Sequence, residues 1–73
     1  GRAPAHSWMA AVLRAAAYKQ PCTIYYVDGG HEKKVTGTPK IIKGDGHSAY
    51  LVEDEAGELT RVTIESIVKA YKL

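Results

Sequence analysis

The chain lacks most of the devices that hold a very small protein together. It has a single cysteine, Cys22, so no intramolecular disulfide can form. His6, His31 and His47 are scattered along the chain without a second cysteine, which argues against a structural zinc site. We therefore expect no metal and no cofactor. The lone thiol fits a reducing, cytoplasmic compartment.

Long hydrophobic runs and a strong charge of one sign are also missing. The most apolar segment, residues 8–18, is interrupted by Arg14 and is too short to span a bilayer, so no membrane partner is expected. Residues 1–8 do not have the shape of a signal peptide. Ten Lys and Arg against eight Asp and Glu give a net charge of +2, which by itself does not indicate nucleic acid.

The chain of 73 residues allows one domain at most, and we place it at residues 8–73. Residues 1–7 are expected to be a flexible lead. Met9 is the only methionine. It is either the natural start, with the residues before it a remnant added for expression, or an internal residue of a domain taken from a longer protein.

Residues 8–19 have the pattern of a helix. Alanine, the best helix former, is the commonest residue there. Trp8, Val12 and Ala16 fall on one apolar stripe at helical spacing. Pro21 ends the run, because the residue before a proline is pushed out of the helical region.

The rest of the chain reads as short strands separated by turns. β-Branched and aromatic residues fill the runs, and Asp28-Gly29-Gly30 and Gly44-Asp45-Gly46 are turn signals. Pro39 is expected at a strand edge or end. The expected strands are residues 22–27, 31–38 with an extended continuation at 40–43, 47–53, 58–64 and 67–71, with a short turn at 65–66.

A helix followed by strands with short connections predicts an antiparallel sheet. Closure of such a sheet into a barrel would remove its unpaired edges. We therefore predict a mainly β fold, with an N-terminal helix followed by a five-stranded antiparallel small barrel of the Sm/SH3-like type. Leu51 is expected in its core. A barrel of this size leaves little room for a buried catalytic site, so we expect a binding module and not an enzyme.

The chain resembles WYL domains, a family of small Sm/SH3-like barrels, over residues 13–73. Two positions depart from the family pattern: Ala49 stands where the family has tryptophan, and Ser66 stands where it has an arginine of the proposed ligand surface. YolD-like and Hfq-like proteins share the same order of elements. The resemblance rests on Ile24-Tyr25-Tyr26, Thr38-Pro39, Ala49-Tyr50-Leu51 and the stretch VTIESI at residues 62–67.

The resemblance implies a bacterial regulatory or accessory domain, often attached to a larger protein that binds or processes nucleic acid. It also implies that the domain binds single-stranded nucleic acid or a nucleotide-like ligand. A protein-interaction or self-assembly module that uses an unpaired strand edge is the alternative from a different class. Because so small a chain gains stability by burying an edge, we expect at least a weak homo-oligomer.

Two sets of side chains are candidates for nucleic-acid binding. Tyr25, Tyr26, Tyr50 and Tyr71 could stack on unpaired bases, and strand alternation favours a surface position for Tyr25 and Tyr50 and a core position for Tyr26. The basic residues could contact phosphates, although lysines also commonly protect sheet edges. The predicted site comprises Tyr25, Tyr50, Lys33, Lys34, Lys40, Lys43 and Arg61.

Overall fold

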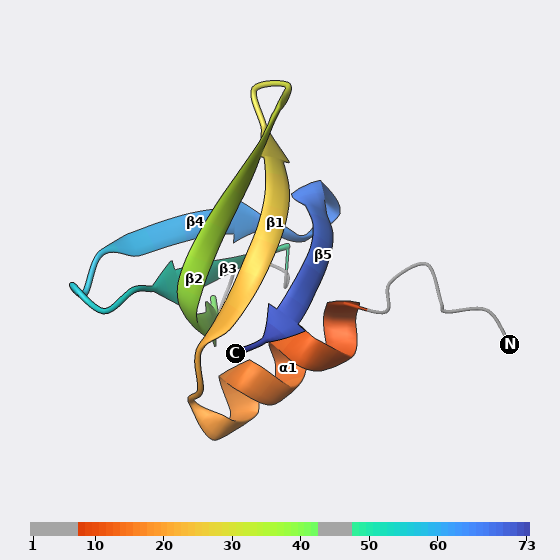
Figure 1. Ribbon diagram of the computed structural model, residues 1–73. Helices are drawn as coiled ribbons and strands as arrows, with labels where there is room; N and C mark the ends of the chain where they lie inside the picture. The colour runs from red at the N-terminus through yellow and green to blue at the C-terminus, as the bar shows by residue number, and fades with distance from the viewer. Residues whose placement is uncertain (1–7, 43–47) are drawn as a thin grey trace, which may run out of the picture.

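A computed structural model describes residues 8–42 and 48–73, and it confirms a mainly β fold with one helix followed by antiparallel strands (Figure 1). The expected lead at residues 1–7 and the expected turn at Gly44-Asp45-Gly46 lie outside the described residues. The elements are α1 (Trp8–Tyr18), β1 (Cys22–Asp28), β2 (His31–Ile41), β3 (Ala49–Glu53), β4 (Leu59–Thr63), the 3₁₀ turn η1 (Ile64–Ser66) and β5 (Ile67–Lys72).

The helix ends in a Schellman motif, one residue earlier than expected. Lys19 has a φ of 54°, in the left-handed region. The backbone N–H of Gln20 donates to the carbonyl of Ala15 at 2.9 Å, and the N–H of Lys19 donates to the carbonyl of Ala16 at 3.4 Å. These two bonds satisfy carbonyls that would otherwise be unpaired at the helix end. The chain then turns through Pro21 into β1.

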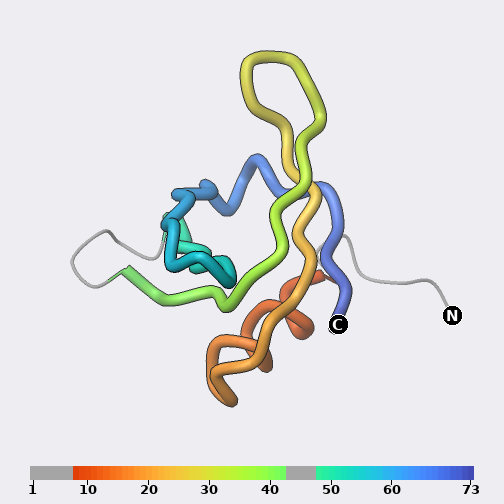
Figure 2. Tube along the Cα trace, turned by 60° about the vertical axis from the view of Figure 1, so that its left-hand side comes forward, coloured from red at the N-terminus to blue at the C-terminus, as the bar shows by residue number. Residues whose placement is uncertain are grey.

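The sheet has the order β4-β3-β2-β1-β5, with every neighbouring pair antiparallel. Its two halves share β2: residues 31–37 pair with β1, and residues 38–41 pair with β3. β4 and β5 form the two edges and do not pair with each other, so the sheet is open. The β1–β2 hairpin extends well beyond the rest of the chain (Figure 2).

β2 changes partner at Gly37, and a glycine is needed there. A Cβ at this position would lie against the backbone carbonyl oxygen of Glu53 and 2.7 Å from its carbonyl carbon. Pro39, expected at a strand edge or end, follows inside β2, where it is buried and in register with Val52. The β1 ladder has already ended at Gly37, so β3 is the only strand paired with β2 at Pro39. A residue without an N–H is tolerated where one side of a strand is unpaired.

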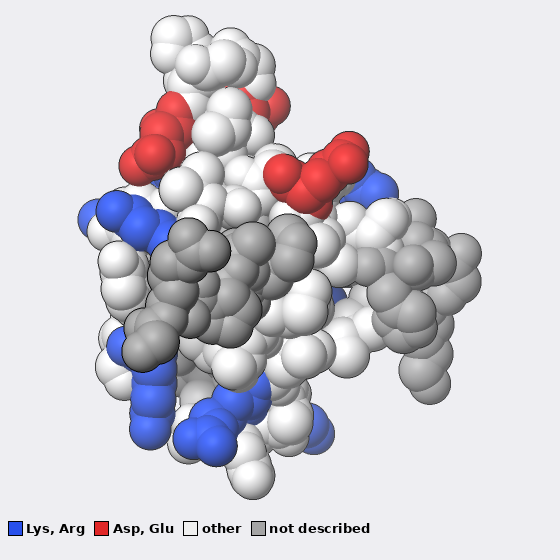
Figure 3. Space-filling view, turned by 90° about the vertical axis from the view of Figure 1, so that its right-hand side faces the viewer, with Lys and Arg blue, Asp and Glu red and all other residues white. Residues whose placement is uncertain are grey.

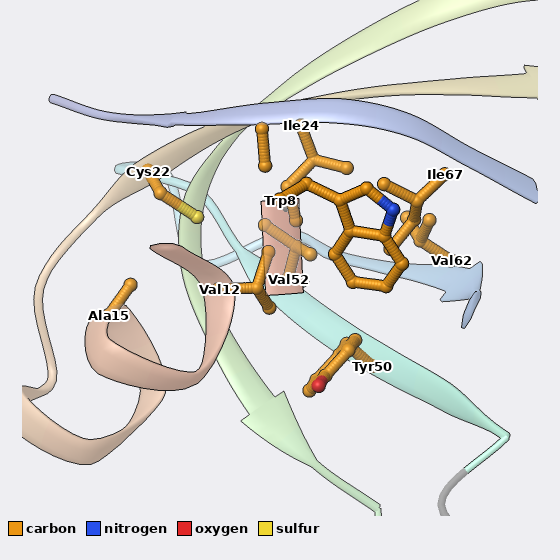
Figure 4. Packing of buried hydrophobic residues seen from close by; sticks show 10 residues of the cluster. Trp8, Val12, Ala15, Cys22, Ile24, Tyr50, Val52, Val62 and Ile67 are labelled. Carbon is orange, nitrogen blue, oxygen red and sulfur yellow. The ribbon is translucent and has the colours of Figure 1, made fainter. Parts of the chain in front are cut away.

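The core lies between α1 and the inner face of the bent sheet (Figure 4). Val12, Ile24 and Val52 are fully buried, and Trp8 is 5% exposed. Tyr26 packs against this cluster, as expected. The buried cluster comprises Trp8, Val12, Ala15, Cys22, Ile24, Tyr50, Val52, Val62, Ile67 and Ala70.

Two expectations for β3 are wrong. Tyr50 was expected at the surface, but it is 5% exposed and belongs to the core. Leu51 was expected in the core, but it is only half-buried and is not part of the cluster. Successive strand residues point to opposite faces, so the burial of Tyr50 and Val52 turns Leu51 outward. No helix within residues 8–42 and 48–73 is long and apolar enough to cross a bilayer.

Candidate nucleic-acid interface

An aromatic and basic surface lies on the outer side of β5, β1 and β2. Tyr25 on β1 stands in cross-strand register between Lys34 of β2 and Lys69 of β5. The adjacent row places Thr23 of β1 between Thr36 and Tyr71. Neighbouring strands are about 4.8 Å apart, so side chains of adjacent rows form one continuous patch. We name the patch the aromatic–lysine face and define it by Tyr25, Tyr71, Lys34 and Lys69.

Strand alternation explains why this surface faces solvent. Ile24 on β1 and Ala70 on β5 point into the core and are buried. Tyr25 therefore points outward on β1, and Lys69 and Tyr71 point outward on β5. The register shift between Tyr25 and Tyr26 in the β1–β5 ladder marks the end of this regular pairing.

The two tyrosines of the face contact each other edge to face. Their ring centroids are 6.1 Å apart and the ring planes cross at 81°. The Nζ atom of Lys69 lies 4.8 Å from the centroid of the Tyr25 ring, within cation–π range. Tyr25 is thereby held between two neighbours, whereas Tyr71 is 56% exposed and presents open ring surface.

The lysines of the face differ from the other predicted lysines in their charge environment. Among residues 8–42 and 48–73, neither Lys34 nor Lys69 forms an ion pair with a carboxylate. Lys33 pairs with Asp28 at 3.0 Å, and the hydrogen bond and charge of that carboxylate raise the pKa of Lys33. Lys40 pairs with Glu53 at 2.6 Å. Lys34 and Lys69 are therefore better placed to meet a phosphate.

The structure does not gather the predicted site into one patch. Lys33 and Lys34 are consecutive in β2, so they project to opposite faces. Lys40 and Arg61 lie in one row with Leu51 across β2, β3 and β4, on the other half of the sheet. The proposed stacking role of Tyr50 is wrong, because its ring is buried in the core. Lys43 lies outside the described residues.

Sequence reasoning left Lys69 and Tyr71 out of the predicted site. The pattern IVKAYK at residues 67–72 already places both on one side of a strand, opposite Ala70. Their contact with Tyr25, however, depends on the pairing of β5 with β1. The two strands are separated by most of the chain, so no local pattern reveals that pairing.

Charged side chains are unevenly distributed over the surface. In the view of Figure 3, most acidic side chains lie toward the β1–β2 hairpin, at the top, and most basic side chains lie below them. This separation lets a near-neutral domain present a local positive potential.

The position of Cys22 does not suit a nucleophile. Cys22 is fully buried, and burial raises the pKa of its thiol. The reactive thiolate is therefore disfavoured and inaccessible. Within residues 8–42 and 48–73, no group of three His, Cys, Asp or Glu side chains could hold a metal ion.

Comparison with known proteins adds no family to this description. No protein-family profile, no curated protein and no solved structure matches the chain. The resemblance to WYL domains therefore stays a prediction from the motifs.

Proposed function

We propose that the chain is a non-enzymatic binding module whose aromatic–lysine face binds single-stranded nucleic acid. The observation that carries the proposal is the contact of Tyr25 with Tyr71 and Lys69, beside a second unneutralised lysine, Lys34. Unpaired bases stack on exposed aromatic rings whatever their sequence. In the setting that the WYL resemblance implies, such a module is part of a larger bacterial regulatory protein.

The geometry favours one unpaired base with a phosphate on either side. The exposed ring of Tyr71 can stack on the base, and the Tyr25 ring lies beside it, roughly perpendicular to it. Lys34 and Lys69 are separated by one strand, which places their Cα atoms about 10 Å apart. Two flexible lysine side chains at that separation can reach phosphates before and after the stacked base.

The small number of unneutralised lysines sets the expected strength. Each phosphate contact releases counterions, so the logarithm of affinity falls with the logarithm of salt by about 0.7 per contact on single strands. Two contacts predict a slope of about −1.4 from Lys34 and Lys69. We therefore expect weak, sequence-tolerant binding that is easily lost at high salt.

Two charge-matched double variants test the lysines. Lys34→Gln with Lys69→Gln and Lys33→Gln with Lys40→Gln each remove two positive charges. Anisotropy titrations of labelled single-stranded DNA and RNA over a salt series should show the slope falling by about 1.4 in the first variant. The second variant should change the salt slope much less, because Lys33 and Lys40 are already paired with carboxylates. Equal losses in both variants would contradict the proposal.

A pair of tyrosine variants tests the stacking surface. Tyr71→Ala should weaken binding by about 1–3 kcal/mol and leave the salt slope unchanged. Tyr18→Ala is the control, because Tyr18 is 68% exposed on α1, outside the face. If the wild-type chain binds neither DNA nor RNA at high micromolar concentration in about 50 mM salt, the nucleic-acid proposal fails.

Self-assembly is the second candidate, and the two unpaired edges favour it. β4 and β5 are the edge strands, each paired on one side only in the described chain, and they expose Leu59 (53%) and Val68 (49%). Unpaired edges can add a strand from another molecule. Sedimentation over a range of concentrations should reveal a weak homo-oligomer that Leu59→Lys with Val68→Lys disperses. A monomer at all concentrations would exclude this candidate.

A further inference from the structure

A hollow of about 290 Å³ lies between α1, the end of β2, the start of β3 and η1. None of the described residues that line it is charged, and none belongs to the aromatic–lysine face. An apolar cavity of roughly 150 Å³ is enough to bind benzene, so this hollow could hold a ring with a substituent. Its lining consists of Met9, Leu13, Ile41, Ala49, Tyr50 and Ile64.

Among the described residues of this lining, Tyr50 is the one that carries a polar side-chain group, its hydroxyl. The side chain is 95% buried, and its hydroxyl end points away from the rest of the core cluster (Figure 4). The oxygen forms no hydrogen bond with the residues at 8–42 and 48–73. This oxygen therefore keeps some accessible surface, because no described side-chain oxygen is both fully covered and without a partner. Tyr50 lines the hollow, which is where a bound molecule can meet that oxygen.

The Tyr50 hydroxyl carries its proton at neutral pH and can act as a hydrogen-bond donor. Burial raises the pKa of Tyr50, so the phenol is protonated at neutral pH. A protonated phenol without a protein acceptor can donate to a bound molecule. The other described side chains of the lining are apolar, and Met9 is flexible enough to adjust to different shapes.

We propose that this hollow binds a neutral, ring-sized organic molecule that carries one hydrogen-bond acceptor, held by the Tyr50 hydroxyl. A charged molecule would lose its hydration without gaining a counter-charge. A peptide would bring an N–H and a C=O for each residue, and the lining side chains offer a single hydroxyl for them. The site shares no residue with the aromatic–lysine face, so the two can be tested independently.

Two probes of nearly the same shape separate the hydroxyl from the apolar lining. Acetophenone carries a carbonyl oxygen where ethylbenzene has a methylene group. NMR titration of the methyl signals of Met9, Leu13, Ile41 and Ile64 should show saturable binding of both probes. In the wild type, acetophenone should bind about three- to tenfold more tightly, the range expected for one net hydrogen bond.

Variants then assign the preference to one atom. Tyr50→Phe should remove the preference for acetophenone and leave ethylbenzene binding unchanged, whereas Tyr26→Phe should keep the preference. Leu13→Glu provides a second route if the Phe variant does not fold, because Leu13 is 44% exposed on α1. A carboxylate at the hollow should weaken both probes several-fold, and Leu59→Glu, remote from it, should weaken neither.

Several results would overturn the proposal. One is the absence of methyl shifts with either probe at millimolar concentration. Others are equal affinity for the two probes in the wild type and a preference that persists in Tyr50→Phe. Methyl shifts that depend on protein concentration without any probe would assign the hollow to a second copy of the chain instead.

Discussion

Replacing Gly37 by alanine tests the central feature of the fold, the change of partner along β2. The added Cβ would lie 2.7 Å from the carbonyl carbon of Glu53 and 3.0 Å from Cγ1 of Val52. Carbon atoms prefer separations of about 3.5–4.0 Å, so the contact is too short by roughly 1 Å. The atoms of Glu53 that the new Cβ would meet belong to the backbone, which cannot rotate aside as a side chain can. β2 and β3 must therefore separate.

The magnitude follows from two opposing terms. Overpacking a well-packed site typically costs 1–3 kcal/mol. Replacing glycine by alanine recovers about 0.4–1 kcal/mol by restricting the unfolded chain. We therefore expect Gly37→Ala to lower the free energy of unfolding by about 1–2 kcal/mol. At a urea slope near 1 kcal/mol per molar for so small a chain, the midpoint should fall by about 1–2 M.

Trp8 provides the signal for this measurement, because it is the only tryptophan and is 5% exposed in the core. Urea unfolding of the wild type and of Gly37→Ala is followed by Trp8 fluorescence under the same conditions. Gly57→Asn is the comparison variant: its added Cβ meets no atom closer than 3.9 Å, so any loss there comes from the left-handed backbone (φ 83°) and not from a clash. A midpoint for Gly37→Ala equal to or above that of the wild type would refute the close approach of β2 to β3.

Three further predictions concern stability and are measured in the same way. Ile24→Ala should lower the free energy of unfolding by ~2–5 kcal/mol because Ile24 is fully buried, whereas half-buried Leu51→Ala should cost only about 1 kcal/mol; equal losses would contradict the outward position of Leu51. Lys19→Gly should stabilise the chain by about 0.5–1 kcal/mol, because it relieves a left-handed conformation at the helix end, and a loss would contradict that conformation. Burial raises the pKa of Cys22, so the folded state keeps a proton that the unfolded chain releases; stability should fall as pH rises above about 9, and less steeply in Cys22→Ala.

Much of the fold could be predicted because its signals are local. The alanine-rich stripe and Pro21 predicted α1 to within one residue, and Asp28-Gly29-Gly30 predicted the β1–β2 hairpin. The break expected in β2 at Pro39 was wrong, because β2 continues through this residue to Ile41. The strand changes partner in its middle, which requires Gly37 and tolerates Pro39, and that exchange is a property of the whole sheet.

The candidate site was predicted less well because it depends on long-range pairing. Tyr25 and Lys34 were both named as candidates, and the β1–β2 ladder places them in register, but their pairing had not been predicted. Tyr50 was placed on the wrong face, because three of the five residues of β3 are buried and its pattern does not simply alternate. The ion pairs of Lys33 and Lys40 also could not be read from composition.

The inner and outer residues of β1 have different roles, and this determines which variants can report on binding alone. Its inner residues, Cys22 and Ile24, build the core, and its outer residue Tyr25 is half-buried and contacts Tyr71 and Lys69. A change at Tyr25 would therefore disturb packing and binding together. Lys34, Lys69 and Tyr71 are exposed, and their substitution removes little buried surface. A binding loss in their variants without a loss of stability would locate the nucleic-acid contact on the outer face of the sheet.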